Sequence, residues 1–311
     1  MLLLPAVVVA QSCRKALPEP WSPFSVNYDV TALARETSWD SLPEFSASPV
    51  ALTESSGAVA CTWNPRAIWV IEDGGAGPML YLIHTHSGKI LAKLQLQTGW
   101  SNIDWEDLAH FTGPDGTPWL AIAEIGDNDA VHPSRAVYAL PEPPATLDTT
   151  QNGIQPWTPP ATKVWNYTYP DGPRDAESMF VDPVDGQLYL VSKRDFRNRI
   201  YRLPAQPSST GLDTATFLGD TPLFMTTAAD RRIMPSGRAP IVVRSYGRLY
   251  YWDAAENESA EEVLQRTPTQ LPYTEQEAQG EIFAWLPDGS YVLLSEEVGG
   301  VAPYVQVYRR N

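Results

Sequence analysis

Acidic side chains recur at one point of a repeated pattern in this sequence. Glu177 and Glu281 each lie six residues before the proline of a turn, and Glu106 lies eight residues before one, in a turn segment that is two residues longer. Asp230 lies five residues before another such proline, so its register is less secure. Carboxylates held at close quarters repel one another unless a cation, protons or basic side chains compensate. The spacing therefore indicates a site for cation binding or acid–base chemistry.

Further polar side chains follow an apolar run in each repeat. Carboxylate and amide oxygens favour Ca²⁺ or Mg²⁺ over Zn²⁺. The expected metal ligands are Glu106, Asp127, Asn128, Glu177, Asp230 and Glu281. Side chains expected to contribute to ligand binding are Glu72, Asp73, Arg194 and Glu296. The alternative for any single carboxylate is a structural role, in which it accepts hydrogen bonds from backbone N–H groups or pairs with an arginine of the next repeat.

Several other chemistries lack support. The sequence has no Gly-x-Ser-x-Gly elbow, no phosphate-binding loop and no His-Glu-x-x-His motif. The acidic stretch at 126–129 would suit calcium, but it lacks the full EF-hand spacing. His110 and His132 have no partner that the sequence reveals. Nucleophilic-serine, nucleotide and zinc-protease chemistry are therefore not expected.

The elements that must position these residues are marked by turns. Five turns built around proline, mostly with Asp or Gly, contain Pro65, Pro114, Pro183, Pro235 and Pro287, which lie 49, 69, 52 and 52 residues apart. An apolar run follows each turn and predicts a strand buried on both faces. These second runs cover 67–71, 119–123, 188–191, 241–243 and 291–294.

A third run, often aromatic, and a weaker fourth run complete each repeat. The third runs cover 80–83, 136–140, 200–203, 249–252 and 305–308, and the fourth runs cover 90–96, 163–167, 216–218 and 263–266. Four antiparallel strands recurring about every 50 residues, without a convincing amphipathic helix, predict an all-β propeller. We expect five blades, with six blades or a β-sandwich as alternatives. A strand within 24–33 is expected to close the ring, and 141–160 is expected to be a surface excursion.

The predicted fold brings the polar residues together. First strands line the central channel of a propeller, so equivalent residues of several blades converge on one axis. Because first and second strands are antiparallel and share a turn, the ends of the second strands face the mouth where the first strands begin. The sequence therefore predicts a cation-binding mouth, occupied by Ca²⁺ or alternatively Mg²⁺.

Composition sets wider limits. The chain has 311 residues with 37 Asp and Glu against 22 Lys and Arg, a net charge of −15. Such a charge argues against a nucleic-acid or anionic-membrane partner. Two cysteines cannot form a disulfide framework or a four-cysteine zinc site. The hydrophobic content of 43% excludes wholesale disorder.

The first residues raise a question of targeting. Residues 2–10 are apolar but too short to span a bilayer, and they resemble a signal-peptide core without its basic start. Cys13 lies where a bacterial lipoprotein is cleaved and acylated, although Ala10 stands where leucine is usual. We therefore expect a leader over 1–13 and a single propeller over 14–311. The expected location is the periplasm, the cell surface as a lipoprotein, or the outside of the cell, with membrane contact only through a lipid on Cys13.

Several strings resemble a group of bacterial exported propellers. They are the segments at 56–57, 64–65, 68–70, 102–109, 125–128, 169–177, 188–193 and 279–281, including Asp-Trp-Glu-Asp-Leu-Ala and Asp-Gly-Pro-Arg-Asp-Ala-Glu. The group comprises the SdiA-regulated and phytase-like esterase proteins, which are similar to gluconolactonase-type propellers. Two departures are Glu72 to Gly75, where Asn-Asp-Ser-Gly is common, and the turn at 234–237 in place of Pro-Asp-Gly. The resemblance implies the fold more strongly than any activity.

Two classes of function fit these observations. In the first, the protein is a monomeric binding module that holds a small-molecule or protein ligand at a metal-bearing mouth. In the second, it is a metal-dependent hydrolase of esters or phosphoesters, in which Glu106 or Glu177 acts as general base and Lys193, Arg194 or Arg244 holds the anion. The binding module is favoured by a small margin, because no histidine is placed as an acid or base.

Overall fold

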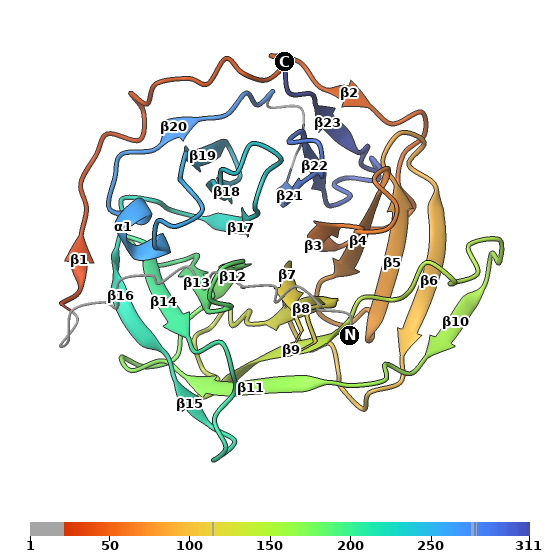
Figure 1. Cartoon of the computed structure of the whole chain (residues 1–311), viewed down its shortest axis with the longest axis horizontal. Helices are drawn as coiled ribbons and strands as arrows, with labels where there is room; N and C mark the ends of the chain where they lie inside the picture. Colours follow the sequence, from red (N-terminus) through yellow and green to blue (C-terminus); the bar gives the residue numbers. More distant parts are fainter. Residues whose placement is uncertain (1–21, 114, 275–276, 278) are drawn as a thin grey trace, which may run out of the picture.

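Five small sheets are arranged in a ring around a central channel (Figure 1). The computed structural model describes residues 22–113, 115–274, 277 and 279–311. The leader predicted over 1–13, with Cys13, lies outside the described residues. Each sheet is one blade of the predicted five-bladed propeller, so the fold class is confirmed.

The strands of each blade run outward from the channel in chain order. The first strands are β3 (Ser55–Ala60), β7 (Trp105–Thr112), β12 (Ala176–Val181), β17 (Thr226–Arg231) and β21 (Gly280–Trp285). The second strands are β4 (Ala67–Glu72), β8 (Pro118–Glu124), β13 (Leu188–Ser192), β18 (Ile241–Ser245) and β22 (Tyr291–Ser295). The third strands are β5 (Met79–His84), β9 (Arg135–Pro141), β14 (Arg199–Leu203), β19 (Arg248–Trp252) and β23 (Gln306–Tyr308).

Apolar side chains on both faces of these strands make the blades pack against each other. One hydrophobic cluster fills each space between neighbouring sheets. Between the first two blades, for example, Trp69 of β4 packs with Trp105 of β7, and both are fully buried. The glycines of the first turns take positive φ, such as 72° at Gly186 and 86° at Gly289, which other residues rarely adopt. Continuous apolar runs and turn glycines thus specify the repeated hairpins.

The outer strands tie each blade to the next one along the chain. Fourth strands are β6 (Ile90–Leu96), β11 (Lys163–Thr168), β16 (Thr216–Asp220) and β20 (Thr269–Gln270). The connection that precedes β11 contains β10 (Ile154–Trp157), which pairs in parallel with β6 of the first blade. The connection that precedes β16 contains β15 (Asp213–Thr214), which pairs in parallel with β11 of the second blade. The excursion predicted at 141–160 therefore covers the outer edge of the preceding blade.

The N-terminal segment closes the ring as predicted, but not with the residues predicted. Strand β2 (Glu44–Phe45) pairs with β23 and completes the fifth blade. Strand β1 (Phe24–Ser25), within the segment 24–33 that we expected to close the ring, instead pairs in parallel with β16 of the third blade. Between these strands Arg35 bridges to Gln270 of the fourth blade, so the first described residues run along three blades in turn, as the red and orange trace shows in Figure 1.

The strand predicted at 263–266 is wrong, because a short helix occupies its place. Helix α1 (Ala260–Leu264) begins at Ser259, whose hydroxyl accepts a hydrogen bond from the backbone of Glu262 and donates one to its carboxylate at 3.0 Å. This Ser-x-x-Glu capping box specifies a helix start. Glu261 of the helix bonds Tyr189 at 2.9 Å and Arg202 at 2.7 Å on the third blade. No helix in the described part of the chain is long and apolar enough to cross a membrane.

Candidate functional site

A β-bulge occurs at the same point of every first strand. In each blade the pairing between first and second strands shifts by one residue just after the first strand begins. The bulged residues, in blade order, are Ser56, Glu106, Glu177, Thr227 and Glu281. A β-bulge redirects a side chain, and bulges are common beside active sites. Three of the five positions therefore present a glutamate to the channel mouth, as predicted for Glu106, Glu177 and Glu281.

The register predicted for Asp230 is wrong. Thr227, not Asp230, is the residue of the fourth blade that corresponds to the three glutamates. Asp230 lies deeper in the channel, where its carboxylate accepts a hydrogen bond from the Trp285 N–H at 2.9 Å. Burial raises the pKa of Asp230 to about 6, although that hydrogen bond opposes the shift. Asp230 thus joins two neighbouring first strands and takes the structural role that was the alternative.

The two bulged residues without a carboxylate have a shared role. The Ser56 hydroxyl donates to the carbonyl of Trp105 at 2.8 Å, and the Thr227 hydroxyl donates to the carbonyl of Gly280 at 2.9 Å. Each of these carbonyls belongs to the residue just before a bulged glutamate. The hydroxyls therefore fix the backbone from which Glu106 and Glu281 project.

Three carboxylates converge, and none of them forms an ion pair with a described lysine or arginine. Single oxygens of Asp73, Asp104 and Glu106 all lie within 4.8 Å of one another. Glu106 is only 7% exposed, and no hydrogen bond to its carboxylate comes from any described residue. The backbone of Gly126 packs so closely on this cluster that a Cβ there would collide with oxygens of Glu106 and Asp104. The three oxygens have the chemistry and the spacing of a binding site for a hard divalent cation.

The protonation equilibria reflect this crowding. Burial raises the pKa of Glu106 well above its usual range, and the charges of Glu177, Asp73 and Asp104 add to the shift. Burial and the neighbouring Asp73 raise the pKa of Asp104 to about 7. Protons or a bound cation are therefore needed to hold these groups together at neutral pH.

A lysine faces the other two glutamates. Lys193 follows β13 and forms a buried ion pair with Glu177, and its ammonium lies 4.9 Å from the ring centre of Tyr246. Burial raises the pKa of Glu177 to about 8, although Lys193 opposes the shift. Burial alone would lower the pKa of Lys193, but the charges of Glu177 and Glu281 outweigh it and raise that pKa. The mouth is therefore asymmetric: Lys193 forms an ion pair with Glu177, whereas no described lysine or arginine forms one with Glu106.

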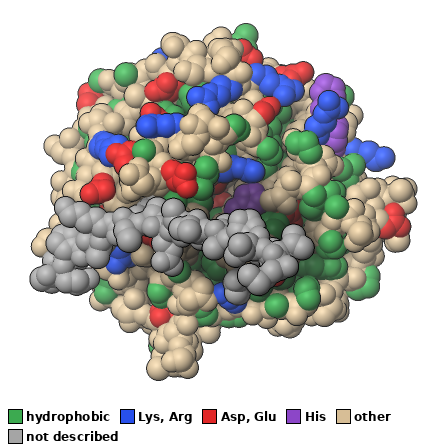
Figure 2. Space-filling view, in the orientation of Figure 1, with side chains coloured by type: hydrophobic (Ala, Val, Ile, Leu, Met, Phe, Trp, Pro, Cys, Tyr) green, Lys and Arg blue, Asp and Glu red, His purple; other side chains and the backbone are tan. Residues whose placement is uncertain are grey.

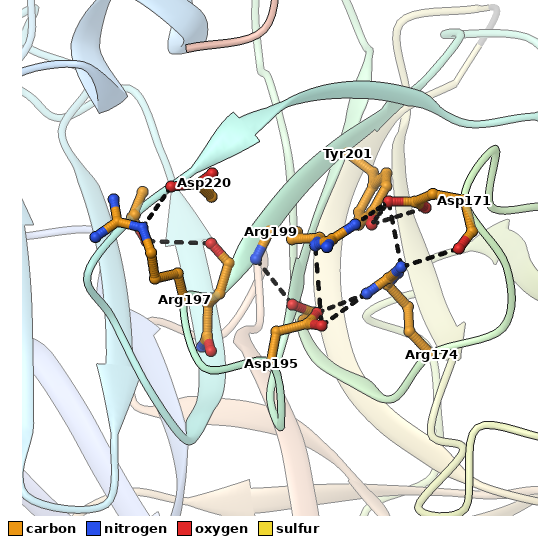
Figure 3. A network of polar contacts seen from close by, with 10 residues as sticks. Asp171, Arg174, Asp195, Arg197, Arg199, Tyr201 and Asp220 are labelled. Carbon is orange, nitrogen blue, oxygen red and sulfur yellow. Dashed lines mark hydrogen bonds and ion pairs between the residues drawn. The ribbon is translucent and has the colours of Figure 1, made fainter. Parts of the chain in front are cut away.

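A polar network fixes the segments that carry Glu177 and Lys193 (Figure 3). Arg174, just before β12, donates to both oxygens of Asp195 at 2.8 Å and pairs with Asp171 at 3.2 Å. Tyr201 donates to Asp171 at 3.0 Å. Since Asp195 lies two residues after Lys193, the network joins the entry of the first strand to the exit of the second. It therefore positions Lys193 against Glu177.

Other predicted site residues lie at the mouth but are occupied by structural contacts. The Asp127 carboxylate accepts hydrogen bonds from the N–H groups of Val131 and His132 at 3.0 and 2.9 Å. The Glu72 carboxylate accepts from the Tyr81 hydroxyl at 2.7 Å and from the Thr53 N–H at 3.3 Å. Both carboxylates thus stabilise loops, and neither belongs to the three-carboxylate cluster.

The predicted anion-holding arginines are also engaged. Arg194 pairs with Asp175 at 2.9 Å and bonds the side chain of Asn128. Arg244 is fully buried, donates to the Ile282 carbonyl and pairs with Glu277. Arg244 therefore joins the fourth and fifth blades, which leaves Lys193 as the predicted cation that lies against the glutamates.

Glu296 borders the mouth from the end of β22. Burial raises the pKa of its carboxyl to about 8, with contributions from the charges of Glu281, Glu54 and Asp73. Its side chain accepts a hydrogen bond from Gln279. The Glu296 carboxyl therefore lies near the other acidic groups of the mouth, where it was predicted to lie.

Asp104 and Asp107 were not predicted from the sequence as site residues. Asp104 and Glu106 are two apart, a spacing that places side chains on one face of an extended segment, and this signal could have identified the pair. Asp107 is fully buried and accepts backbone hydrogen bonds from Leu108 at 2.8 Å, Met179 at 2.8 Å and Ala229 at 3.0 Å. Asp107 thereby joins three blades beneath the mouth. No pattern in the sequence predicts that role.

The solved structures that this chain resembles are all distant from it. No family model matches this chain, and no curated protein matches it. A chain of a nidogen/laminin complex has a TM-score of 0.42 and 11% identity, over 78% of this chain and 72% of that chain. The PQQ-bound aldose sugar dehydrogenase from Streptomyces coelicolor has a TM-score of 0.41 and 9% identity, over 86% of this chain and 99% of its own. The Dos1 propeller has a TM-score of 0.37 and 11% identity, over 86% of each chain.

Proposed function

We propose that this protein is an exported propeller that binds a divalent cation, preferentially Ca²⁺, at Asp73, Asp104 and Glu106, and that it recognises a partner protein at the same mouth. One observation carries the cation site: Glu106 is 93% buried, has no hydrogen-bond partner among the described residues, and faces two further carboxylates within 4.8 Å. A buried charge without a partner is costly, and a cation removes that cost. Oxygen ligands alone favour Ca²⁺ or Mg²⁺ over Zn²⁺.

Exposed apolar side chains around the mouth support a protein ligand. Ile103, Val131, Phe196 and Val301 are between 61% and 92% exposed, and each lies on a loop that leads into a first strand or follows a second strand. An apolar rim around a polar centre is typical of protein-binding surfaces. The loops on the side of the ring that carries the cation site thus present a surface for a partner.

Replacement of Glu106 by glutamine is expected to weaken Ca²⁺ binding by about 100-fold or more, because a charged ligand becomes neutral in a site with three carboxylates. Isothermal titration of the Ca²⁺-free protein measures the change. Asp129→Asn is the matched control, since Asp129 is exposed on the same side of the ring and lies outside the cluster. Equal affinity in the Glu106→Gln variant and the unchanged protein would refute the cation site.

A metal-dependent hydrolase is the second candidate, and one observation favours it. Glu177, with a pKa raised to about 8, pairs with Lys193 and lies within the electrostatic reach of Glu106. A carboxyl with such a pKa can exchange a proton near neutral pH. Lys193 could then hold an anionic substrate beside the cation.

The two candidates are separated by activity measurements. If the hydrolase is correct, p-nitrophenyl esters or phosphates should be cleaved with Ca²⁺, and EDTA should abolish the activity. Glu177→Gln should lower kcat by about 100-fold or more, while Ca²⁺ affinity changes little. No cleavage across the panel would leave the binding module.

A further inference from the structure

A pocket lies at the end of the channel away from the cation site. It has a volume of about 620 Å³ and is lined by the far ends of β7, β12 and β17 and by the turns that follow them. His110 of β7 lines it four residues beyond Glu106, which corresponds to about 13 Å along a strand. Figure 2 shows one face of the ring, with a histidine side chain visible near its middle. The pocket is of the size that small-molecule ligands occupy.

Two buried polar atoms in this pocket have no partner. His110 Nε2 and Arg232 Nη1 are both inaccessible to solvent, and neither forms a hydrogen bond with any described residue. Such atoms are rare in folded proteins and point to a bound water, ion or ligand. Both residues line the pocket, and the charge of Arg232 acts on the His110 ring, so the two groups lie near each other.

Arg232 differs from the arginine beside it. Arg231 forms a fully buried ion pair with Asp182 at 2.6 Å and donates to the Glu258 carbonyl at 2.6 Å. No ion pair within 4.0 Å is recorded for Arg232 in the part of the chain that the structure describes. The carboxylates that influence Arg232 are engaged elsewhere: Asp230 accepts from Trp285, and Glu142 accepts from Thr62 and Trp69. The Arg232 guanidinium therefore has donor capacity left for an anion.

His110 supplies the opposite kind of group. Its ring interacts with the backbone of Ala60, so we place the ring proton on Nδ1, which leaves Nε2 as an acceptor. Burial lowers the pKa of His110 to about 3, and the Arg232 charge adds to the shift, so the ring is neutral at physiological pH. Of the acidic groups lining the pocket, Asp182 is paired with Arg231 and Asp185 accepts from the Gln187 N–H at 3.0 Å.

We propose that this pocket binds a small organic anion that carries a hydroxyl group beside its carboxylate. The carboxylate accepts hydrogen bonds from Arg232, and the hydroxyl donates to His110 Nε2. A guanidinium recognises a carboxylate strongly, and the neutral imidazole selects for a ligand that brings a proton of its own. The site is independent of the cation site at the mouth, because Asp107 and its three backbone bonds lie between the two.

Matched probes test both contacts on the unchanged protein. We expect lactate to bind, and both propionate, which lacks the hydroxyl, and lactamide, which lacks the charge, to bind about tenfold more weakly or worse. Titrations followed by NMR should show the His110 Nε2 resonance moving with lactate. Equal binding of the three probes, or a lactate titration that leaves the His110 ring unchanged, would overturn the proposal.

Variants separate this site from its surroundings and from the mouth. Arg232→Gln should weaken lactate binding by about tenfold or more. Arg238→Gln is the matched control and should not weaken it, because Arg238 lies in the same turn as Arg232 but its side chain is 41% exposed and pairs with Asp253. Melting temperatures establish that both variants fold. Lactate should bind equally well to Glu106→Gln, so a failed cation site would leave this result standing. Unchanged lactate affinity in folded Arg232→Gln would refute the assignment.

Discussion

Replacing Asp107 with asparagine is expected to lower the free energy of unfolding by about 3 kcal/mol or more. One carboxylate oxygen accepts from Met179 and Ala229, on the third and fourth blades, and the other accepts from Leu108. An asparagine amide would place an N–H group against one of these N–H donors, in a position that water cannot reach. Burial raises the pKa of the Asp107 carboxyl well above its usual range, although the three hydrogen bonds oppose the shift.

Denaturant unfolding followed by tryptophan fluorescence measures this loss. Asp129→Asn removes the same charge from an exposed position and should change the free energy by no more than about 0.5 kcal/mol. Similar stabilities of the two variants would show that Asp107 does not hold the blades together. Because Asp107 lies one residue from Glu106, the variant should also lower the Ca²⁺ affinity of the cation site.

The second large effect is a pH dependence that Ca²⁺ reverses. The pKa of Asp104 is raised to about 7, and those of Glu177 and Glu296 to about 8. These carboxyls hold their protons more tightly in the folded than in the unfolded chain, where the pKa is about 4. Their stabilising contribution is full below that value and is lost as the pH rises through 7 and 8. The Ca²⁺-free protein should therefore melt roughly 5 °C lower at about pH 8 than at about pH 5.

Added Ca²⁺ should restore the part of that stability that is lost at Asp104 and Glu106 at about pH 8, and it should have little effect at about pH 5, where protons occupy the oxygens of these two ligands. Differential scanning calorimetry with Ca²⁺ or with EDTA measures both melting temperatures. Mg²⁺ at the same concentration tests the preference for Ca²⁺. A melting temperature that rises with pH in EDTA, or a Ca²⁺ effect that is equal at both pH values, would contradict the expectation.

Much of the fold could be predicted because its signal is local. Runs such as 67–71 and 188–191 are apolar at consecutive positions, which only a strand buried on both faces explains, and each follows a turn with glycine or proline. The helix at 260–264 was also specified locally, by the pair Ser259 and Glu262. The closing strand could not be placed, because β2 has two residues and owes its position to β23, far along the chain.

The site was predictable in part for a related reason. Counting back from a turn proline placed Glu177 and Glu281 correctly, since their turns have equal lengths. The same count failed for Asp230, because the fourth blade reaches its proline through a different turn and the bulge falls at Thr227. Whether a carboxylate has hydrogen-bond partners depends on the conformation of the loop around it, which could not be predicted from the sequence. Asp127 is satisfied by N–H groups of its own loop, whereas Glu106 is not satisfied by any described residue.

The pairing of β2 with β23 also sets the timing of folding during synthesis. Residues 44–45 pair with residues 306–307, and Trp39 bridges to Arg310, so the ring cannot close until residues 306–310 have been made. Until then, the open side of the first blade and the inner faces of the later blades have no partner, and the growing chain depends on other factors to avoid aggregation. The proposed export would benefit from this order, because a chain that crosses a membrane unfolded must not close its ring beforehand.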